Sequence, residues 1–338
     1  GRPHPSRRRL APMARQLSGD PDRLVLIGGR SHPAFTEATA ASLGIAPSPV
    51  RLRTFSDGAI EAKLEVNVRG RDVYIVQSGQ ANPNDHLMEL CFMIDAARRA
   101  SARSISAILP YFPYGKGDKK DEPRVSIRAR VVADILEVAG VDRVLTIDLH
   151  AGQLQGFFRV PVDNLYALPV FAVEAERLMT VGEIGPPVFV SPDAGRAKLA
   201  RDYSRRLGAM GAGVAIGDKV RPTQDESSEV TAVLGSVAGR DCIIVDDIIF
   251  TGGTLCNMAQ ALVDSGARSV RAMVTHGLLT AGAASAIGRS PLVEVVVTDS
   301  VPPPTLAVPR VRQVTLAPLF AQAIRSIHDE TSISRLFE

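Results

Sequence analysis

Cysteine, long hydrophobic runs and net charge are all scarce in this chain. Its three cysteines, Cys91, Cys242 and Cys256, lie in apolar segments without metal-site spacing, so we expect reduced thiols in a cytoplasmic protein. The chain has no apolar stretch of about eighteen residues, which excludes a membrane-spanning helix. The formal net charge of +3 is too small to indicate nucleic-acid binding.

The chain has instead the composition of a soluble globular protein, with 45% hydrophobic and 22% charged residues. Its 338 residues exceed what one core usually supports, so we expect two domains, at 22–166 and 167–316. A helix within 317–338 is expected to rejoin the first domain. Residues 1–21 include an arginine-rich stretch without a typical secretory segment, and we predict a disordered tail, with a basic arm as the alternative.

Residues 241–255 carry the most informative pattern. A run of β-branched residues ends at adjacent carboxylates, Asp246 and Asp247, followed by a Thr-Gly-Gly-Thr loop and apolar residues at helical spacing. Glycine N–H groups, threonine hydroxyls and a helix N-terminus suit a phosphate. The carboxylates repel phosphate but suit sugar hydroxyls or Mg²⁺. The pattern predicts a phosphorylated sugar as ligand; the alternative is an acidic pair that only ends a strand.

An internal repeat organises the chain. The segment that begins at Leu90 recurs at Leu255, and the segment around Arg103 recurs around Arg268, both at an offset of 165 residues. An ungapped match over a helix and its following strand indicates duplication of one α/β domain. The first copy, at 74–78, lacks both the acidic pair and the small-residue loop, so we expect the sugar-phosphate site in the second copy.

Strand and helix patterns alternate along the chain, which predicts mostly parallel sheets flanked by helices, with ligands at the carboxyl ends of strands. We predict strands at 24–28, 50–54, 59–66, 73–78, 104–109, 144–148, 187–191, 213–217, 229–236, 241–246, 269–275 and 293–298. We predict helices at 34–43, 84–100, 126–139, 167–179, 196–207, 254–265, 280–288 and 317–328.

Two of these strands deliver groups that suit a metal ion. The strand at 144–148 places Asp148 and His150 at its end, and the strand at 187–191 precedes Asp193. One imidazole and one carboxylate, together with ATP phosphates, suit Mg²⁺ when water and phosphate supply most of its ligands. A lone histidine at a strand end is more often a capping or packing group, and this remains the alternative for His150.

Several ordered motifs together resemble the ribose-phosphate pyrophosphokinase, or PRPP synthetase, family of the phosphoribosyltransferase-fold superfamily. The longest is RVLTIDLHAGQLQGFFRVPVDNL at 143–165, and shorter ones lie at 55–58, 84–90, 108–112, 191–195 and 332–334. The resemblance covers residues 22–338. It implies an α/β fold of two tandem duplicated phosphoribosyltransferase-like domains. It also implies an enzyme that transfers the diphosphoryl group of MgATP to O1 of ribose 5-phosphate, which gives PRPP and AMP.

The resemblance further implies roles for individual residues. Lys219 and Arg221 match the catalytic Lys-x-Arg of a flexible loop, in a reaction that needs positioning and charge neutralisation. The implied ATP-binding residues are Phe55, Asp57, Lys116, Asp118, Lys119 and His150; the implied ribose 5-phosphate residues are Asp246, Asp247, Thr251, Gly252, Gly253 and Thr254; the implied Mg²⁺ ligands are His150 and Asp193; and the implied allosteric residues are Arg69, Gln155, Ser332 and Ser334.

The family's assembly and control can be carried over in the same way. The resemblance implies a homo-oligomer in which dimers form a hexamer, with Phe55 and Asp57 reaching the adenine of a neighbouring subunit. Phosphate and ADP are the implied effectors, bound at a subunit interface. Ser332 and Ser334 could equally cap the end of a C-terminal segment.

Five positions depart from the family pattern. Lys116 replaces an arginine, Gly117 a glutamine, Ala59 a glutamate, Arg196 a glycine and Phe250 an aspartate. Lysine cannot stack on adenine as a guanidinium plane does, so we expect weaker selection of the base.

Two alternative functions follow from these departures. The first is a non-catalytic, regulatory paralogue, which the presence of the catalytic, metal-binding and acidic-pair residues disfavours. The second is a phosphoribosyltransferase that consumes PRPP, a class that needs one such domain and no ATP loop.

Overall fold

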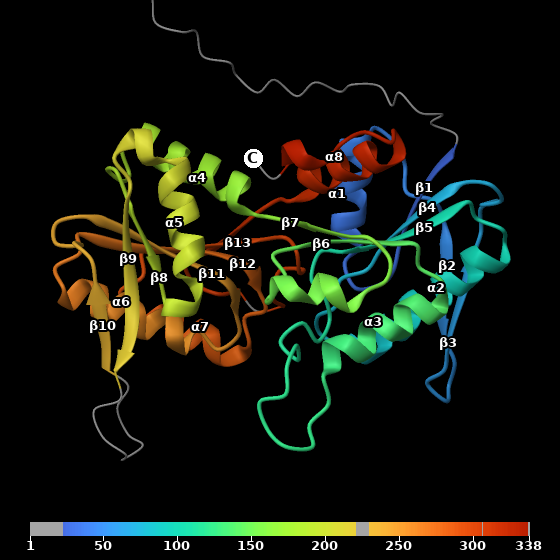
Figure 1. The fold of residues 1–338 in the computed structure, drawn as a ribbon, viewed down its shortest axis with the longest axis horizontal. Coiled ribbons are helices and arrows are strands. Elements are labelled where there is room, and N and C mark those ends of the chain that lie inside the picture. Colours follow the sequence, from blue (N-terminus) through green and yellow to red (C-terminus); the bar gives the residue numbers. More distant parts are fainter. Residues whose placement is uncertain (1–22, 221–229, 306, 337–338) are drawn as a thin grey trace, which may run out of the picture.

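Two mostly parallel sheets, each covered by helices on both faces, lie side by side in the structure (Figure 1). The computed structural model describes residues 23–220, 230–305 and 307–336, apart from the side chains of 218–220, 230 and 231. The predicted tail at 1–21 therefore lies outside the described residues. None of the described helices is long and apolar enough to cross a membrane.

The first half of the chain forms a five-stranded parallel sheet and a separate hairpin. Helices α1 and α8 cover one face of the sheet, and α2 and α3 cover the other. In sheet order the strands are β1 (Leu24–Gly28), β4 (Asp72–Val76), β5 (Ser104–Leu109), β6 (Arg143–Ile147) and β7 (Val162–Leu165); the hairpin is β2 (Val50–Thr54) and β3 (Ile60–Leu64); the helices are α1 (Pro33–Leu43), α2 (Pro83–Arg99), α3 (Arg128–Ala139) and α8 (Ala317–His328).

The second half forms a seven-stranded sheet in which only the β10–β9 pair is antiparallel among the described strands. Helices α4 and α5 cover one face, and α6 and α7 cover the other. In sheet order the strands are β10 (Val230–Leu234), β9 (Gly213–Val220), β8 (Val188–Ser191), β11 (Asp241–Ile249), β12 (Ser269–Gly277), β13 (Glu294–Thr298) and β14 (Val311–Val314); the helices are α4 (Leu168–Thr180), α5 (Ala197–Arg206), α6 (Gly253–Asp264) and α7 (Ala281–Arg289).

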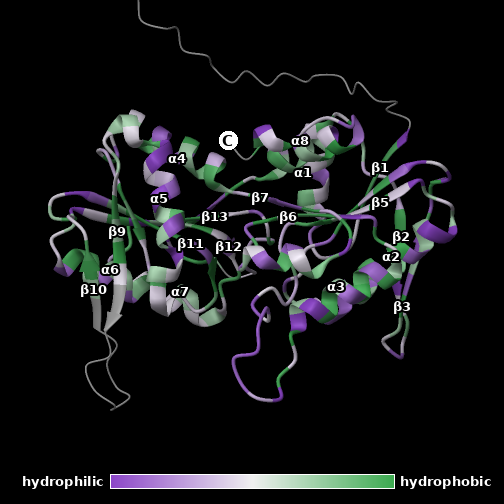
Figure 2. Cartoon of the chain, viewed as in Figure 1, coloured by the Kyte–Doolittle hydropathy of each residue, from purple (hydrophilic) through white to green (hydrophobic). Residues whose placement is uncertain are grey.

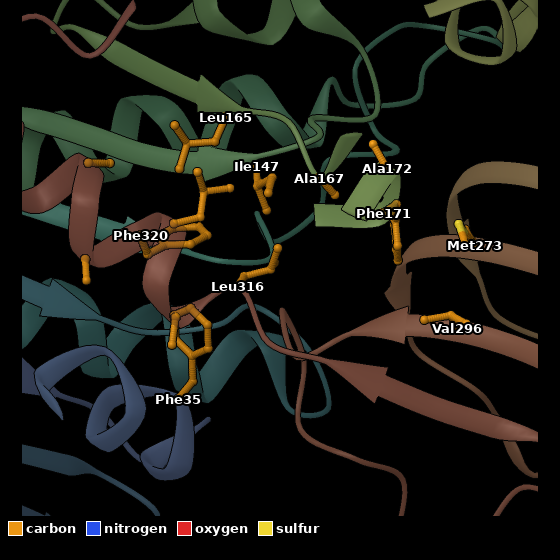
Figure 3. Close-up of a cluster of buried hydrophobic side chains, with 14 of the residues drawn as sticks. Phe35, Ile147, Leu165, Ala167, Phe171, Ala172, Met273, Val296, Leu316 and Phe320 are labelled. Carbon is orange, nitrogen blue, oxygen red and sulfur yellow. The ribbon is translucent and has the colours of Figure 1, made fainter. Parts of the chain in front are cut away.

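One hydrophobic cluster runs through both halves. Phe35 of α1 meets Phe320 of α8 edge to face, with ring centroids 5.3 Å apart. Figure 3 shows Phe171 of α4 between this pair and the second sheet, where Met273 and Val296 belong to the same cluster. Because the halves share this buried cluster, its packing holds the edges of the two sheets in a defined relation.

The predicted duplication is visible in the strand order. The first sheet runs β1-β4-β5-β6-β7, and the second contains β8-β11-β12-β13-β14 in the same parallel arrangement. Each copy also inserts an antiparallel hairpin after its first strand, β2–β3 in one half and β9–β10 in the other. The second hairpin joins its sheet through β8 and β9, whereas the first stays separate.

The duplication also preserves a buried polar network. Asp72 in β4 accepts hydrogen bonds from Arg103 Nε and Ser104 Oγ, each at 2.7 Å. Asp241 in β11 accepts from Arg268 Nε at 2.9 Å and from Ser269 Oγ at 2.7 Å. These two donors lie 165 positions after the arginine and serine of the first network. Bonds from Arg268, together with Ser269 and the Gly185 N–H, outweigh burial and lower the pKa of Asp241 to about 2.

Removing one of these aspartates is expected to destabilise the fold. Asp241→Ala removes a buried carboxylate that accepts from Arg268, Ser269 and the Gly185 N–H, so the free energy of unfolding should fall by about 1–3 kcal/mol. Asp202→Ala is the control, since its partner Arg205 is 79% exposed and such pairs contribute about 0.5 kcal/mol. Urea unfolding followed by circular dichroism measures both, and equal losses would show that the network does not stabilise the protein.

The predicted elements all have counterparts, with ends that differ by a few residues. The strand expected to end at residue 246 continues to Ile249, because its pairing with β12 extends to Gly277. The acidic pair therefore lies within the strand, not after it. Strands β7 and β14 were not predicted. The domain limits at 166 and 167, which fall between β7 and α4, stay a prediction.

Candidate active site

A cavity of about 250 Å³ opens beside the carboxyl ends of strands from both sheets. Lys116 and His150 line it from the first half of the chain, and Asp193, Asp246 and Asp247 line it from the second. The Thr-Gly-Gly-Thr loop at 251–254 forms another part of the wall. The structure thus brings together residues that the sequence predicted for the nucleotide, the metal ion and the sugar phosphate, although they lie up to 138 positions apart in the chain.

The loop at 251–254 joins β11 to α6 at this cavity. Gly252 is the N-cap of α6 and has a left-handed φ of 79°, which favours glycine. The carbonyl oxygen of Gly252 accepts from the Cys256 N–H at 2.9 Å. The N–H groups of the preceding first turn have no acceptor within the helix and carry its positive dipole end. This wall of the cavity therefore suits a phosphate.

The acidic pair is joined to His150 and Arg196. Asp247 is 6% exposed at its side chain, and its Oδ2 lies 2.6 Å from His150 Nδ1 and 2.7 Å from Arg196 Nη2. Arg196 Nη2 also donates to the His150 carbonyl oxygen at 3.1 Å. Arg196 Nη2 also lies 2.9 Å from Nδ1, so the roles of the ring nitrogens follow the tautomer: with the proton on Nδ1, the imidazole donates to Asp247. The Nε2 atom of His150 is then the ring nitrogen left for a ligand.

The two carboxyl groups of the pair differ in protonation. Burial, followed by the neighbouring charge of Asp247, raises the pKa of Asp246. Burial acts in the same direction on Asp247, but the hydrogen bond from His150 and the charge of Arg196 lower the pKa of that carboxyl. Of the two, Asp247 is therefore the carboxyl that ionises more readily, and Asp246 is the one that holds its proton more tightly.

Lys116 and Phe250, two of the departures from the family pattern, touch each other. Lys116 Nζ lies 4.4 Å from the centroid of the Phe250 ring, a cation–π contact. The same two side chains line a neighbouring cavity of about 290 Å³, together with Tyr114 and Arg128. Gly117 follows at a position where an added Cβ would stand 2.6 Å from Arg128 Nε. Arg128 thus fills the space that a longer residue at 117 would need.

Asp148 links the two halves beneath the cavity. Its Oδ2 accepts from Thr275 Oγ1 at 2.6 Å and from the Ala167 N–H at 3.2 Å, and burial raises its pKa to about 6. His276 Nε2 lies 3.3 Å from the Asp148 carbonyl oxygen, and burial lowers the pKa of His276 to about 4. These contacts connect β12 to the end of β6 and so fix the edge that carries His150.

Several predicted ATP-binding residues lie outside the cavity wall. Phe55 and Asp57 occupy the turn of the β2–β3 hairpin, at the outer edge of the first half (Figure 1). Phe55 is 41% exposed, and the Arg53 guanidinium lies 5.0 Å from its ring centroid. Asp118 accepts from Gln153 Nε2 at 3.3 Å, and Lys119 is exposed. Figure 2 shows the loop before α3, which carries these two residues, largely in hydrophilic colours.

The predicted allosteric residues each contact their own surroundings. Arg69 is exposed, with Nη1 3.4 Å from Ser101 Oγ, and Gln155 Nε2 donates to the Gly152 carbonyl oxygen at 3.0 Å. The Ser334 N–H donates to Ser332 Oγ at 3.2 Å. This last bond is the local cap that the sequence offered as the alternative to an anion site.

The structure describes the two predicted catalytic residues only in part. Lys219 belongs to strand β9, where its backbone pairs with Thr231. Arg221 lies outside the described residues. Their roles stay a prediction.

The donors at the cavity fit a Mg²⁺ ion that takes few protein ligands. His150 offers Nε2, and Asp193 offers the carboxylate whose Oδ1 accepts from the Arg196 N–H at 3.1 Å. Among the described residues, no group of three or more His, Cys, Asp or Glu side chains is arranged to hold a metal ion. Water and phosphate oxygens commonly complete such Mg²⁺ shells.

Sequence reasoning did not place Arg196 and Phe250 in the site, although both line the cavity. It marked both as departures from the family pattern. The sequence does not show what either side chain contacts, because the contacting residues are distant in the chain. Asp247 is 51 positions from Arg196, and Lys116 is 134 positions from Phe250. The available signal was the position of these two residues. Each lies beside a motif of the predicted site, where a changed side chain is expected to contact the site or its wall.

Comparisons with known proteins show the family of this chain. Residues 24–140 match the N-terminal domain of ribose phosphate pyrophosphokinase, and residues 212–338 match the phosphoribosyl synthetase-associated domain. The chain is 45% identical to a ribose-phosphate pyrophosphokinase of Brucella melitensis, over 93% of this chain and 99% of that protein. It is 47% identical to one of Vibrio cholerae, over 92% and 98%.

A solved structure extends the likeness to three dimensions. The crystal structure of phosphoribosylpyrophosphate synthetase from Mycobacterium smegmatis superimposes with a TM-score of 0.84 at 36% identity. The superposition covers 91% of this chain and 99% of that chain.

Proposed function

This chain belongs to the ribose-phosphate pyrophosphokinase family, and we propose that it transfers the diphosphoryl group of MgATP to O1 of ribose 5-phosphate. The products are PRPP and AMP. The non-catalytic alternative has no support among relatives that are 45% identical over nearly their full length. A phosphoribosyltransferase role is equally unsupported, because the match extends over both halves of the chain.

One observation carries the proposal: a single cavity is lined from one half by His150 and Lys116 and from the other by the acidic pair and the phosphate loop. A transfer reaction needs its donor and acceptor within one enclosed space, aligned for attack. The nucleotide phosphates are assigned to the His150 side, and the sugar phosphate to the loop at 251–254. The sugar then lies between the two, beside Asp247.

The chemistry requires attack of the sugar O1 on the β-phosphorus of ATP. A P–O bond forms to O1, the bond between the β-phosphorus and the oxygen shared with the α-phosphorus breaks, and AMP leaves with that oxygen. The electron pair of the broken bond stays on the AMP oxygen, and the O1 proton is released to solvent. Asp247 accepts from the ribose hydroxyls and orients them, and the N-terminus of α6 holds the 5-phosphate. Lys219 and Arg221 are assigned to the charge on the bridging and leaving oxygens.

Mg²⁺ would be held by His150 and Asp193 and would offset negative charge on the nucleotide phosphates. Phosphate and ADP remain the proposed effectors, and a homohexamer built from dimers the proposed assembly. The position of Phe55 and Asp57 on an outer hairpin suits residues that complete a neighbouring subunit's nucleotide site. A cytoplasmic location stays part of the proposal.

The decisive test is the identity of the nucleotide product. Purified protein supplied with MgATP and ribose 5-phosphate should release AMP in equal amount to PRPP, as measured by chromatography of the quenched reaction. Release of ADP would identify a monophosphoryl kinase and contradict the proposal. Turnover that depends on neither sugar nor Mg²⁺ would contradict it as well.

The Lys116–Phe250 contact predicts weak selection of the base. Because the ammonium group is engaged with the Phe250 ring, it contributes little to adenine recognition, and one lost base contact costs about 1 kcal/mol. Lys116→Arg should therefore raise the preference for ATP over GTP about five-fold in kcat/KM. Lys120→Arg, an exposed change in the same loop at a residue with no assigned role, is the control. The assignment fails if the wild type already rejects GTP by several orders of magnitude and Lys116→Arg changes nothing.

A further inference from the structure

The acidic pair suits two kinds of ligand, sugar hydroxyls and a divalent cation. Hydroxyl groups donate hydrogen bonds to carboxylate oxygens, and a divalent cation is coordinated by them, so adjacent carboxylates attract either ligand. The residue beside the pair decides between them. In this chain that residue is Arg196, at a position where the resemblance implies glycine more commonly.

Arg196 is held in place at both its backbone and its side chain. Its N–H donates to Asp193 Oδ1 at 3.1 Å, which caps the short turn before α5. Its guanidinium lies 2.7 Å from Asp247 Oδ2, and its Nε lies 3.9 Å from Asp246 Oδ1. The side chain is 23% exposed. Arginine stays charged in this setting, so the pair has a fixed positive partner.

This arrangement fills the acceptor capacity of one oxygen of the pair, Asp247 Oδ2. Asp247 Oδ2 receives both the His150 Nδ1 contact and the Arg196 Nη2 contact, and one carboxylate oxygen has two lone pairs. A divalent ion at this oxygen would have to displace one of the two donors. It would also stand within a few ångströms of the guanidinium charge, where repulsion in a partly buried site is strong. Neutral hydroxyl groups meet no such repulsion.

We propose that Arg196 is the resident cation of the acidic pair: it keeps a divalent cation away from Asp246 and Asp247 and reserves them for the hydroxyls of the sugar. The inference rests on the proposed function, since it concerns the sugar subsite of that reaction. Arg196 also contacts His150, so a divalent cation enters on the His150 and Asp193 side together with the nucleotide phosphates, whose negative charge offsets the guanidinium. Arg196 acts through the pair and is a positioning residue.

Mn²⁺ binding to the protein without nucleotide or sugar tests the proposal directly. Free Mn²⁺ is measured by electron paramagnetic resonance during titration of wild type, Arg196→Gln and Arg196→Lys. Wild type and Arg196→Lys should bind Mn²⁺ weakly, whereas Arg196→Gln should gain one site with affinity at least about ten-fold higher. Glutamine keeps hydrogen-bond donors and removes the charge, so this comparison isolates the charge.

Two further variants locate the gained site. Asp247→Asn in the Arg196→Gln background should abolish the added Mn²⁺ site. Lys198→Ala, an exposed change in α5 two residues further along the chain, should bind Mn²⁺ as the wild type does. Thermal melting monitored by circular dichroism confirms folding of each variant. Should Arg196→Gln not fold, Arg196→Met, which also removes the charge, is titrated in its place.

The outcomes separate cleanly. Tight Mn²⁺ binding by the wild type at the pair, equal affinity in Arg196→Gln, or a gained site that survives Asp247→Asn would each overturn the proposal. Failure of the proposed function would appear elsewhere, as ADP in place of AMP in the product assay. The titration uses no substrate, so its result stands independently of that assay.

Discussion

Replacing Lys219 with alanine is expected to lower kcat about 1,000-fold while KM for ribose 5-phosphate changes by less than about three-fold. The reason is the timing of the charge that Lys219 is proposed to meet. Negative charge on the bridging and leaving oxygens develops during transfer, so the ammonium group stabilises the transition state more than bound substrate. The same substitution at Arg221 should have a similar effect.

Steady-state kinetics with MgATP and ribose 5-phosphate measure this effect, with Lys63→Ala as the control. Lys63 lies on β3 with its side chain 57% exposed and 3.8 Å from Glu65, so its removal should leave kcat unchanged. A Lys219→Ala enzyme that keeps its kcat and loses only sugar affinity would place Lys219 in substrate binding. Lys219→Arg should recover part of the rate, since it restores charge without the same geometry.

The alternating architecture could be predicted because long apolar runs and helical periodicity mark most of its elements. Strands such as β11 and β12 are buried along nearly their whole length, and their β-branched sequences show it. The duplication was visible for the same reason, as a helix and strand repeated without a gap. From parallel strands it follows that His150, Asp193 and the acidic pair gather at carboxyl ends, and they do line one cavity.

Strands β7 and β14 could not be predicted because their stability comes from their neighbours. Each is four residues long and half polar, too short for a periodic signal. In the fold, Asp163 of β7 pairs with Arg143 on the adjacent strand β6. Arg312 of β14 pairs in the same way with Glu294 on β13. Cross-strand pairs of this kind are invisible until the sheet order is known.

The acidic pair gives the second large prediction. Asp247→Asn should weaken binding of ribose 5-phosphate about 100-fold, because a hydrogen bond to a charged acceptor contributes about 1.5–3 kcal/mol and the change also frees Arg196 and His150 from their shared partner. Affinity for MgATP should stay within about three-fold. Isothermal titration calorimetry with each ligand alone measures both affinities.

Asp246→Asn is the matched variant, because it changes the adjacent carboxyl at the same cavity. Burial and the charge of Asp247 raise the pKa of Asp246, so its carboxyl holds a proton more readily than that of Asp247, and an amide resembles the protonated form in charge and shape. Asparagine at 246 should therefore cost sugar affinity only about three-fold, against about 100-fold at 247. Equal losses at the two positions would mean that the negative charge is shared between them. Loss of ATP binding with sugar affinity intact would exchange the two subsites, and the nucleotide would then belong beside the loop at 251–254.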